Sequence, residues 1–350
     1  MKGSAFTRRR LISLAATAIA VGAPAGFTSL TSTAAAAGGT LNGAGSTLVA
    51  PLEARWAAAF NSKTGNTVNY AAVGSGTGIT DISNRSVDFG ASDAPMTPAQ
   101  ASACHGCVMI PWALTATGIG YNVPGIGSKL KLTGPVLVKI YLGQIKTWNS
   151  PAIKKLNKGL KLPSLAITTV HRSDGSGDTY AFTNYLSHVS GTWKSHIGAA
   201  TTVSFPGGVA EDGNGGVVSE VKATRGAIGY AAVSYLIAQR VSAAAVQNKA
   251  GKYEYPNYSN IENAASIVKR VPKNNVVSLV DPPKKAKIAY PISTFTYAIA
   301  PKSGNKQAGL LKSFIKYAIG PGQSFGPSLD FAKLPKVILK ADQKAAGSLK

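Results

Sequence analysis

The sequence predicts an α/β fold, and three observations support this prediction. Apolar and β-branched runs typical of strands alternate with runs of helical spacing along most of the chain. Several of these strands end in a turn rich in glycine and serine that opens the next helix. The chain has 350 residues, of which 45% are hydrophobic and only 15% charged, so it can bury the cores of two lobes and is not disordered. The alternation favours sheets made mostly of parallel strands.

The first 37 residues have the pattern of an export signal. Three arginines at positions 8–10 precede the apolar run LISLAATAIAVGA, and small residues before Ala37 fit a cleavage site. The same arginines are compatible with the twin-arginine export route. The apolar run is too short and too rich in alanine for a membrane anchor, and no cysteine follows it to carry a lipid. We therefore expect residues 1–37 to be a cleaved signal peptide and the protein to be exported, secreted or associated with the cell wall, without a lipid anchor.

The segment after this signal predicts three strands, each close to a Gly- or Ser-rich turn. Residues 40–45 predict a short strand before an amphipathic helix, for which the pair at 46–47 (Ser-Thr) supplies the expected caps. Residues 67–73 predict a second strand, which ends at the run GSGTG and a second helix. Residues 87–92 predict a third strand, which ends at Asp93. The glycine spacing excludes a dinucleotide-binding motif.

Two long apolar runs are candidates for strands that cross between lobes. They occupy residues 108–123 and 288–301. Between them, residues 135–143 predict a helix, and a second, Lys-rich helical stretch follows at 144–163. Residues 207–223 contain a further Gly-rich helix entrance.

Further strands and helices are predicted on either side of the second crossing strand. A strand and a helix are predicted within 226–239, and Ser259 with Glu262 forms a capping box for a helix through Val268. Ser303 is the expected cap of a helix that Gly320 and Pro321 end. The tail from Pro335 reads as a basic amphipathic helix.

The stretch HRSDGSGDTYAFTNYL at residues 171–186 predicts an anion-binding turn. A strand feeds a Gly-Ser-Gly turn that opens a helix, and the first N–H groups of a helix have no internal partner and lie at the positive end of its dipole. Arg172 adds a planar fork of donors that matches phosphate, and Asp174 is close enough in sequence to orient it. His171 should point to the opposite side of the strand.

The net charge of +23 predicts attraction to anionic partners. No zinc-finger, helix-turn-helix or RNA-binding signature is present, so we expect no nucleic-acid partner and interpret the lysines as surface that faces acidic cell-wall polymers. Cys104 and Cys107 form the motif CHGC, which in a cytosolic protein would indicate redox or metal chemistry but after export favours a disulfide. Two cysteines and four scattered histidines do not make a metal site.

Taken together, the motifs resemble the phosphate-binding proteins of bacterial phosphate ABC transporters, the PstS family. The resemblance covers the chain from about Thr40 to Pro335 and implies a two-lobed periplasmic-binding-protein fold of type II, with mixed sheets flanked by helices and phosphate in the interlobe cleft. Residues 38–122 and 296–350 would form the first lobe and residues 123–295 the second, with hinges near 121–125 and 293–297. The motifs that carry the resemblance are GAGSTL, VNYAAVGSGTG, VDFGASDAPMT, YLGQIKTWNSPAIKKLN, HRSDGSGDTYAFTNYL and RGAIGY.

The resemblance also implies a set of ligand-binding residues. Asp174 would hold the guanidinium of Arg172 in place without touching the ligand. The sequence departs from a common family pattern at Leu48, where many members have Phe, and at Asp178, where many have Thr. The residues implied to bind phosphate are Thr47, Leu48, Ser75, Asp93, Arg172, Ser176, Gly177 and Asp178.

The function implied is reversible capture of inorganic phosphate and its delivery to the membrane permease, without catalysis, cofactor or metal, by a monomer. A secreted phosphatase is the enzyme alternative, but the chain has no G-x-S-x-G nucleophile elbow. Two binding alternatives stay open: a receptor for another oxyanion such as sulfate or molybdate, and a cell-wall protein that holds polyphosphate or teichoic acid on its positive surface.

Overall fold

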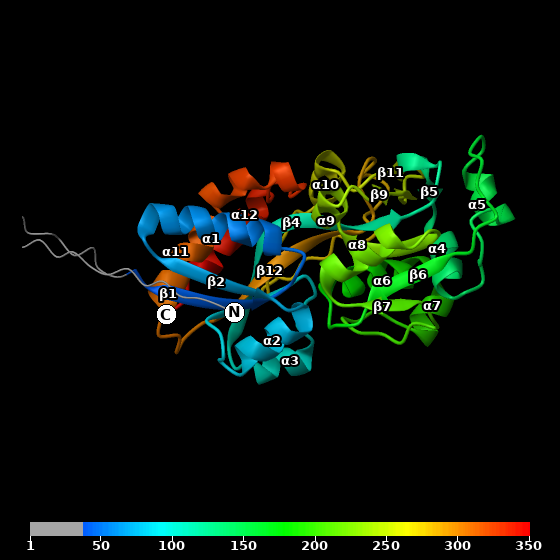
Figure 1. Ribbon diagram of the computed structural model, residues 1–350. Coiled ribbons are helices and arrows are strands. Elements are labelled where there is room, and N and C mark those ends of the chain that lie inside the picture. The colour runs from blue at the N-terminus through cyan, green and yellow to red at the C-terminus, as the bar shows by residue number, and fades with distance from the viewer. Residues whose placement is uncertain (1–37) are drawn as a thin grey trace, which may run out of the picture. The chain divides into compact units, whose positions relative to one another are not determined.

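A nine-stranded sheet with the order β2-β1-β3-β12-β4-β8-β6-β7 organises the protein, and β9 pairs with β4 beside this path (Figure 1). The structure is a computed structural model that describes residues 38–350, so the signal peptide expected at 1–37 lies outside the described residues. A second sheet has the order β11-β10-β5. The strands are β1 (Thr40–Gly45), β2 (Thr67–Ala72), β3 (Phe89–Ser92), β4 (Cys107–Tyr121), β5 (Lys131–Leu132), β6 (Thr168–Arg172), β7 (Val209–Glu211), β8 (Ala227–Ala232), β9 (Ser242–Ala243), β10 (Ala245–Gln247), β11 (Tyr253–Glu254) and β12 (Ser293–Pro301).

The two apolar runs form the central strands β4 and β12, which connect two lobes. Both strands are buried along nearly their whole length, which explains why their sequences do not alternate. β12 pairs with β3 and with residues 107–116 of β4, whereas β8 pairs with residues 117–121 of β4. In Figure 1 both strands run from the elements around β1 and α1 toward those around β6 and α8. One strand, β4, therefore belongs to the sheets of both lobes.

The sheet is mixed, and the expectation of mostly parallel strands is wrong. The outer strands of the large sheet are parallel in each lobe, since β1 pairs with β2 and β3, and β6 pairs with β7 and β8. The central strands are antiparallel to their neighbours, as β12 is to β3 and β4, and as β4 is to β8. Strands that alternate with helices are expected to be parallel only where a helix connects two neighbouring strands in a βαβ unit. The strands β4 and β12, which connect the lobes, are not joined to their neighbours in this way and run antiparallel to them.

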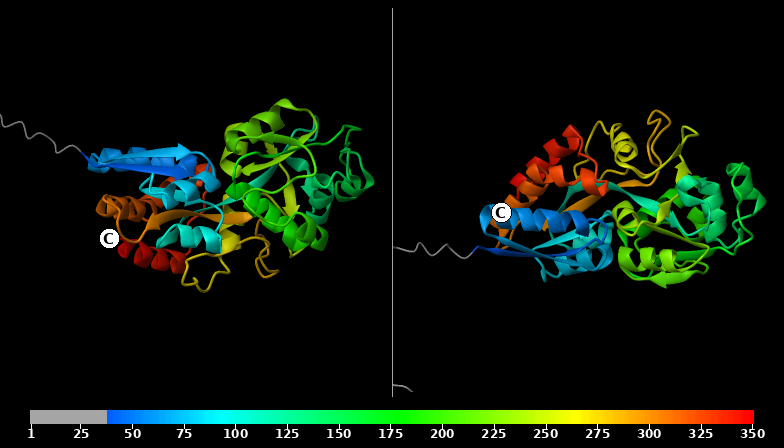
Figure 2. Two further views of the ribbon diagram at one scale, coloured as in Figure 1. Left: turned by 90° about the horizontal axis from the view of Figure 1, so that it is seen from below. Right: turned by 45° about the horizontal axis from the view of Figure 1, so that its top comes forward.

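Helices cover the faces of the sheet in both lobes, and the C-terminal helices lie beside the N-terminal elements in both views of Figure 2. Among residues 38–350, no helix is long and apolar enough to cross a bilayer. The helices beside the first lobe are α1 (Ala50–Thr64), α2 (Ser75–Ser83), α3 (Pro98–Ala103), α11 (Ala308–Ala318) and α12 (Lys336–Gly347), with 3-10 turns η2 (Pro321–Phe325) and η3 (Pro327–Leu329). The remaining helices are η1 (Gly127–Lys129), α4 (Gly134–Tyr141), α5 (Pro151–Leu156), α6 (Gly177–Val189), α7 (Gly191–His196), α8 (Gly213–Ala223), α9 (Val233–Ala238) and α10 (Tyr258–Ala265).

Aromatic side chains form much of the core of each lobe. Trp56 from α1 packs edge-on against Trp112 of β4, with ring centroids 5.2 Å apart, and both side chains are fully buried. In the second lobe, Phe182 of α6 stacks on Tyr230 of β8 at 4.6 Å. A fully buried large apolar side chain contributes about 1.5–3 kcal/mol. These contacts hold α1 against β4 and α6 against β8, beside the turns that form the candidate site.

Three predicted helix caps are wrong. α1 begins at Ala50 and has no side-chain cap, so the pair at 46–47 does not cap it. α10 begins at Tyr258, where Asn257 accepts the capping bond in place of the predicted Ser259. α11 begins at Ala308, beyond Ser303, and has no side-chain cap. Cap preferences identify side chains that are able to cap, but tertiary contacts decide where the backbone turns and which hydroxyls are already engaged.

Candidate functional site

Buried polar groups from several distant segments meet where the two lobes touch. One segment follows β1, another begins α2, a third follows β3, and the largest runs from the end of β6 into α6. Parallel strands bring their carboxyl ends to one edge of a sheet, which explains why turns so far apart in sequence converge. The exposed fractions of the candidate residues are at most 8%: Thr47 8%, Leu48 0%, Ser75 1%, Asp93 2%, Arg172 5%, Ser176 1% and Asp178 1%.

Asp93 is held by hydroxyl groups of two other loops. The Ser46 hydroxyl lies 2.7 Å from both carboxylate oxygens of Asp93 and also accepts the Leu48 N–H at 3.0 Å. Ser75 accepts the Asp93 N–H at 3.2 Å and lies 3.4 Å from Asp93 Oδ2. Burial and the nearby Asp178 carboxylate raise the pKa of Asp93 to about 7, although the Ser46 bond and the Arg172 charge act in the opposite direction. Burial thus opposes the charged form of Asp93, whereas the Ser46 hydroxyl and the Arg172 guanidinium favour it.

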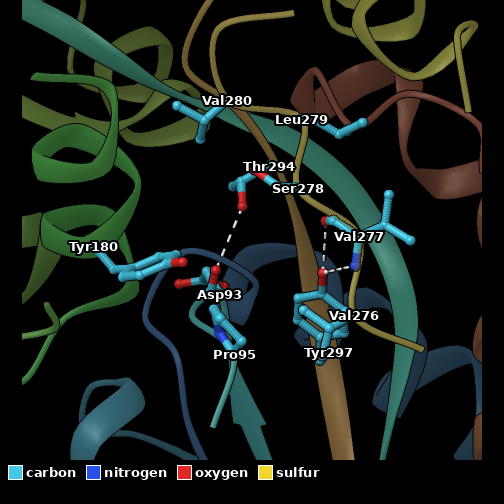
Figure 3. A pocket seen from close by; sticks show the side chains of 10 residues that line it. All are labelled: Asp93, Pro95, Tyr180, Val276, Val277, Ser278, Leu279, Val280, Thr294 and Tyr297. Atoms are coloured by element: carbon cyan, nitrogen blue, oxygen red, sulfur yellow. Dashed lines mark hydrogen bonds between the residues drawn. The ribbon is translucent and has the colours of Figure 1, made fainter. Parts of the chain in front are cut away.

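A small cavity of about 40 Å³ lies beside Asp93 (Figure 3). Asp93 and Tyr180 form one part of its wall, and the segment 276–280 forms another. The Thr294 hydroxyl of β12 approaches the backbone oxygen of Asp93 at 3.4 Å. The turn after β3 is thus fixed against a central strand, which sets the position of the carboxylate.

Arg172, at the end of β6, is oriented by two carboxylates. Its Nε lies 2.5 Å from Asp174 Oδ1, and its Nη2 pairs with the other oxygen of the same residue. Its Nη1 lies 3.4 Å from Asp178 Oδ2. The neighbouring His171 is turned away and stacks on Phe205 with ring centroids 4.5 Å apart. One edge of the guanidinium is thus anchored, and the other faces the buried site.

Asp178 lies in the first turn of α6 and accepts bonds from three directions. Thr117 of β4 donates to Oδ1 at 2.6 Å, and the Asn214 amide donates to Oδ2 at 2.7 Å. Burial raises the pKa of Asp178, while the Arg172 charge and these two hydrogen bonds oppose the rise. The carboxylate is therefore buried with a hydrogen bond on each oxygen.

Asn214, at the start of α8, links the two lobes. Its amide nitrogen lies 2.8 Å from Thr47 Oγ1 as well as 2.7 Å from Asp178 Oδ2, and its oxygen accepts the Ala232 N–H at 2.6 Å. The sequence predicts no role for Asn214 or Thr117 and predicts Ser46 as a helix cap. Asn214 could have been found only from its place in a Gly-rich helix entrance. Thr117 lies in a mostly apolar strand, where nothing in the sequence marks it as a site residue.

Glycines without a side chain at positions 74 and 177 allow the turns of the two lobes to approach one another closely. A Cβ atom on Gly177 would lie 2.4 Å from Asp93 Oδ2, and one on Gly74, whose φ is 87°, would lie 2.3 Å from Asp174 Oδ2. The Gly76 N–H donates to the Gly175 oxygen at 2.8 Å, which joins the two lobes a second time. No other residue type fits at Gly74, because both its φ and its surroundings require glycine.

The ends of α2 and α6 add favourable electrostatics for an anion. Ser75 is the first residue of α2, and Ser176 caps α6 by accepting the Thr179 N–H at 3.2 Å. Unpaired N–H groups and the positive end of the dipole lie at such helix starts. Within residues 38–350, no group of three His, Cys, Asp or Glu side chains could hold a metal ion. The arrangement of a guanidinium, helix starts, hydroxyls and buried carboxylates fits an oxyanion that also donates a proton.

Comparison with known proteins places the chain in a family. The family model described as a PBP superfamily domain matches residues 30–321. The chain is 38% identical over 304 residues to phosphate-binding protein PstS of Xylella fastidiosa, covering 86% of this chain and 83% of that protein. It is 36% identical over 307 residues to the PstS protein of Pasteurella multocida, covering 87% and 89%.

A solved structure shows the same fold. A phosphate-binding protein from Stenotrophomonas maltophilia superimposes with a TM-score of 0.69 at 20% identity, over 87% of this chain and 93% of that one. The similar α/β architecture and the high coverage in sequence point to the same conclusion. The chain belongs to the PBP superfamily and, within it, to the PstS family of phosphate-binding proteins.

Proposed function

We propose that this protein captures inorganic phosphate between its lobes and delivers it unchanged to an ABC transporter permease. The observation that carries this proposal is the meeting of Arg172, Asp93 and the starts of α2 and α6 in one buried site. The relatives named PstS support phosphate as the ligand. Phosphate would contact Thr47, Leu48, Ser75, Asp93, Arg172, Ser176, Gly177 and Asp178, through hydroxyl groups, backbone N–H groups, the guanidinium and the carboxylates.

Asp93 supplies selectivity for a protonated oxyanion. A charged carboxylate only accepts hydrogen bonds, so a ligand beside it must donate one. Hydrogen phosphate carries a proton at neutral pH, whereas sulfate carries none. If sulfate were bound, the Asp93 carboxylate and a sulfate oxygen would face each other as two acceptors without a proton between them. The lost hydrogen bond and the repulsion of like charges both disfavour sulfate. Asp178 adds a second buried acceptor and favours the more protonated form of phosphate.

We expect the two lobes to close around the ligand by bending at the central strands. We assign residues 38–122 and 296–350 to the first lobe and 123–295 to the second, with hinges near 121–125 and 293–297. The change of pairing partner along β4, from β12 to β8, supports a hinge close to the end of that strand. The hydrogen bond between Asn214 and Thr47 would then hold the closed, loaded form that the permease recognises.

The proposal includes export, a monomeric state and the absence of catalysis. The arginines and apolar run within residues 1–37 support a cleaved signal peptide. Exposed lysines support retention beside acidic cell-wall polymers, as does the net charge of +19 that stays after residues 1–37 lose their four basic groups from the total of +23. In the site, His171 is turned toward Phe205, which leaves Ser176 without a histidine as general base at this position.

Isothermal titration calorimetry of the exported chain with phosphate, sulfate and molybdate tests the proposal. We expect tight binding of one phosphate per chain and no displacement by a large excess of sulfate at neutral pH. Displacement by sulfate would contradict the role of Asp93, and tighter binding of molybdate would identify a different receptor. Turnover of a chromogenic phosphate ester that is lost in Ser176→Ala would instead indicate a phosphatase. Binding to the buried site should change little with salt, whereas polyphosphate held on surface lysines should dissociate.

A further inference from the structure

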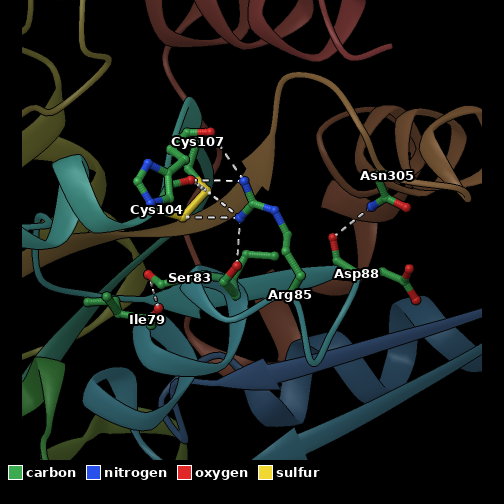
Figure 4. Close-up of a disulfide and its surroundings, with 9 residues drawn as sticks. Ile79, Ser83, Arg85, Asp88, Cys104, Cys107 and Asn305 are labelled. Carbon is green, nitrogen blue, oxygen red and sulfur yellow. Dashed lines mark hydrogen bonds between the residues drawn. A yellow bond between two sulfur atoms is a disulfide. The ribbon is translucent and has the colours of Figure 1, made fainter.

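A disulfide joins Cys104 and Cys107, neither of which belongs to the candidate phosphate site (Figure 4). Cys104 directly follows α3, and Cys107 is the first residue of β4. Cys104 is fully buried, Cys107 is half-buried, and the two residues between them are exposed. An incoming thiol therefore meets Cys107 first.

The guanidinium of Arg85 is directed at both sulfur atoms. Its Nη1 lies 3.4 Å from Cys107 Sγ and 3.7 Å from Cys104 Sγ. The same group is held by the backbone oxygens of Ile82 at 2.7 Å, Cys104 at 2.9 Å and His105 at 3.2 Å (Figure 4). The Arg85 backbone has φ 57°, an unfavourable conformation for a residue with a side chain. The position of the guanidinium is thus determined by several contacts.

The Arg85 charge has no carboxylate partner among residues 38–350. The ion pairs of this region join Arg172 to Asp174 and Asp178, and Lys249 to Asp281. A disulfide sulfur is a neutral and weak acceptor, whereas a thiolate is a full negative charge. Arg85 therefore interacts more strongly with the reduced pair than with the disulfide.

A purely structural role explains this disulfide poorly. It joins residues three apart in sequence, and a loop this short restricts the unfolded chain least. The surrounding backbone is already fixed, because Thr97 and Gln100 form a capping box at the start of α3 and the Cys104 N–H donates to the Gln100 oxygen at 2.9 Å. Because these hydrogen bonds already hold the turn, the disulfide adds little further order to it.

We propose that Cys104 and Cys107 form a thiol–disulfide exchange site for low-molecular-weight thiols, with Arg85 stabilising the reduced pair. A thiolate of the small molecule attacks Cys107 Sγ, a mixed disulfide forms, and the bond between the two protein sulfurs breaks. Cys104 Sγ leaves with the electron pair as a thiolate beside Arg85. A second small thiolate attacks the outer sulfur of the mixed disulfide and releases Cys107. Two small thiols become one disulfide, and the protein gains two electrons.

Equilibration of the full exported chain with mixtures of reduced and oxidised glutathione tests the proposal. The fraction of reduced protein is measured by alkylation and mass spectrometry. Arg85→Gln should shift the equilibrium toward the protein disulfide at least tenfold, which corresponds to about 30 mV for this two-electron couple. Arg85→Lys should shift it less. Arg240→Gln is the matched control, since Arg240 is also exposed with φ 56° and is absent from the contacts of the disulfide, so its equilibrium should equal that of the wild type.

A second measurement needs no variant. After reduction, the alkylation rate of the wild-type Cys107 thiol should titrate at least one pH unit below the ordinary thiol pKa of about 8.5. A thiol that titrates at or above 8.5, or equal glutathione equilibria for wild type and Arg85→Gln, would overturn the proposal. Unchanged phosphate affinity in Arg85→Gln establishes that the variant is folded.

Discussion

Gly177 and Asp93 are in contact across the two lobes, and a methyl group on Gly177 would reach within 2.4 Å of Asp93 Oδ2. Gly177 is the first residue of α6, and Asp93 follows β3. The contact means that the helix start reaches the carboxylate with its backbone alone. The spacing between these two turns is therefore limited by the size of one side chain.

Gly177→Ala should weaken phosphate binding at least tenfold without destabilising the protein. The added methyl group prevents the two turns from closing, while the backbone of Gly177, which is not among the glycines with positive φ, accepts alanine without strain. Calorimetry gives the affinity and chemical denaturation gives the stability. Gly191→Ala, at the start of α7 where a Cβ meets no atom within 4 Å, is the control and should bind as the wild type does. Equal affinities of the two variants would contradict this account of closure.

Asn214→Ala should also weaken phosphate binding, by about tenfold or more. The change removes the hydrogen bonds to Thr47 and Asp178, and a bond to a charged group contributes about 1.5–3 kcal/mol. Stopped-flow measurements should show that most of the loss is faster release, because the bond to Thr47 ties the lobes together. Asn84→Ala, an exposed change at the end of α2, serves as the comparison. A slower association rate with unchanged release would show that Asn214 acts before closure.

Asp93→Asn should reduce the preference for phosphate over sulfate at least tenfold. An asparagine amide donates hydrogen bonds, so an oxyanion without a proton is no longer rejected. Competition calorimetry at pH 7 measures the ratio of the two affinities. Asp81→Asn removes an equal charge on α2 and should leave the ratio as it is. If sulfate stays excluded from Asp93→Asn, selectivity comes from another group.

Asp342→Leu should stabilise the protein by about 1–3 kcal/mol at pH 8, the usual cost of a buried polar group without a partner. Both carboxylate oxygens of Asp342 lie in the interior without a hydrogen-bond partner among residues 38–350, and burial raises its pKa from 3.8 to about 9.

The effect of Asp342 should depend on pH in one direction. Between pH 3.8 and 9 the folded chain binds a proton at Asp342 that the unfolded chain has lost, so wild-type stability falls as the pH rises through this window. The gain from Asp342→Leu should accordingly be small at pH 4 and largest near pH 8, as measured by urea denaturation. Glu262→Gln, an exposed change, should show no such trend. A gain that shrinks with rising pH would mean that Asp342 is charged in the folded protein.

The sequence determined the features that depend on neighbours along the chain. Arg172 and Asp174 are two residues apart at the end of a strand, so their pairing follows from local geometry. The anion-binding turn before α6, the two buried crossing strands and the amphipathic helices likewise follow from periodicity and turn residues. These patterns were sufficient to predict the α/β class and the family resemblance.

Only the tertiary structure decided which distant groups share the site. Thr117 lies within an apolar strand and Asn214 within a Gly-rich turn, yet both donate to Asp178 because β4, β6 and β8 are adjacent in one sheet. Ser46 resembles a helix cap in sequence, but its hydroxyl binds Asp93. Side-chain chemistry and spacing are local properties, whereas adjacency is set by the order and direction of the strands. Those depend on packing of the whole chain, which no short segment encodes.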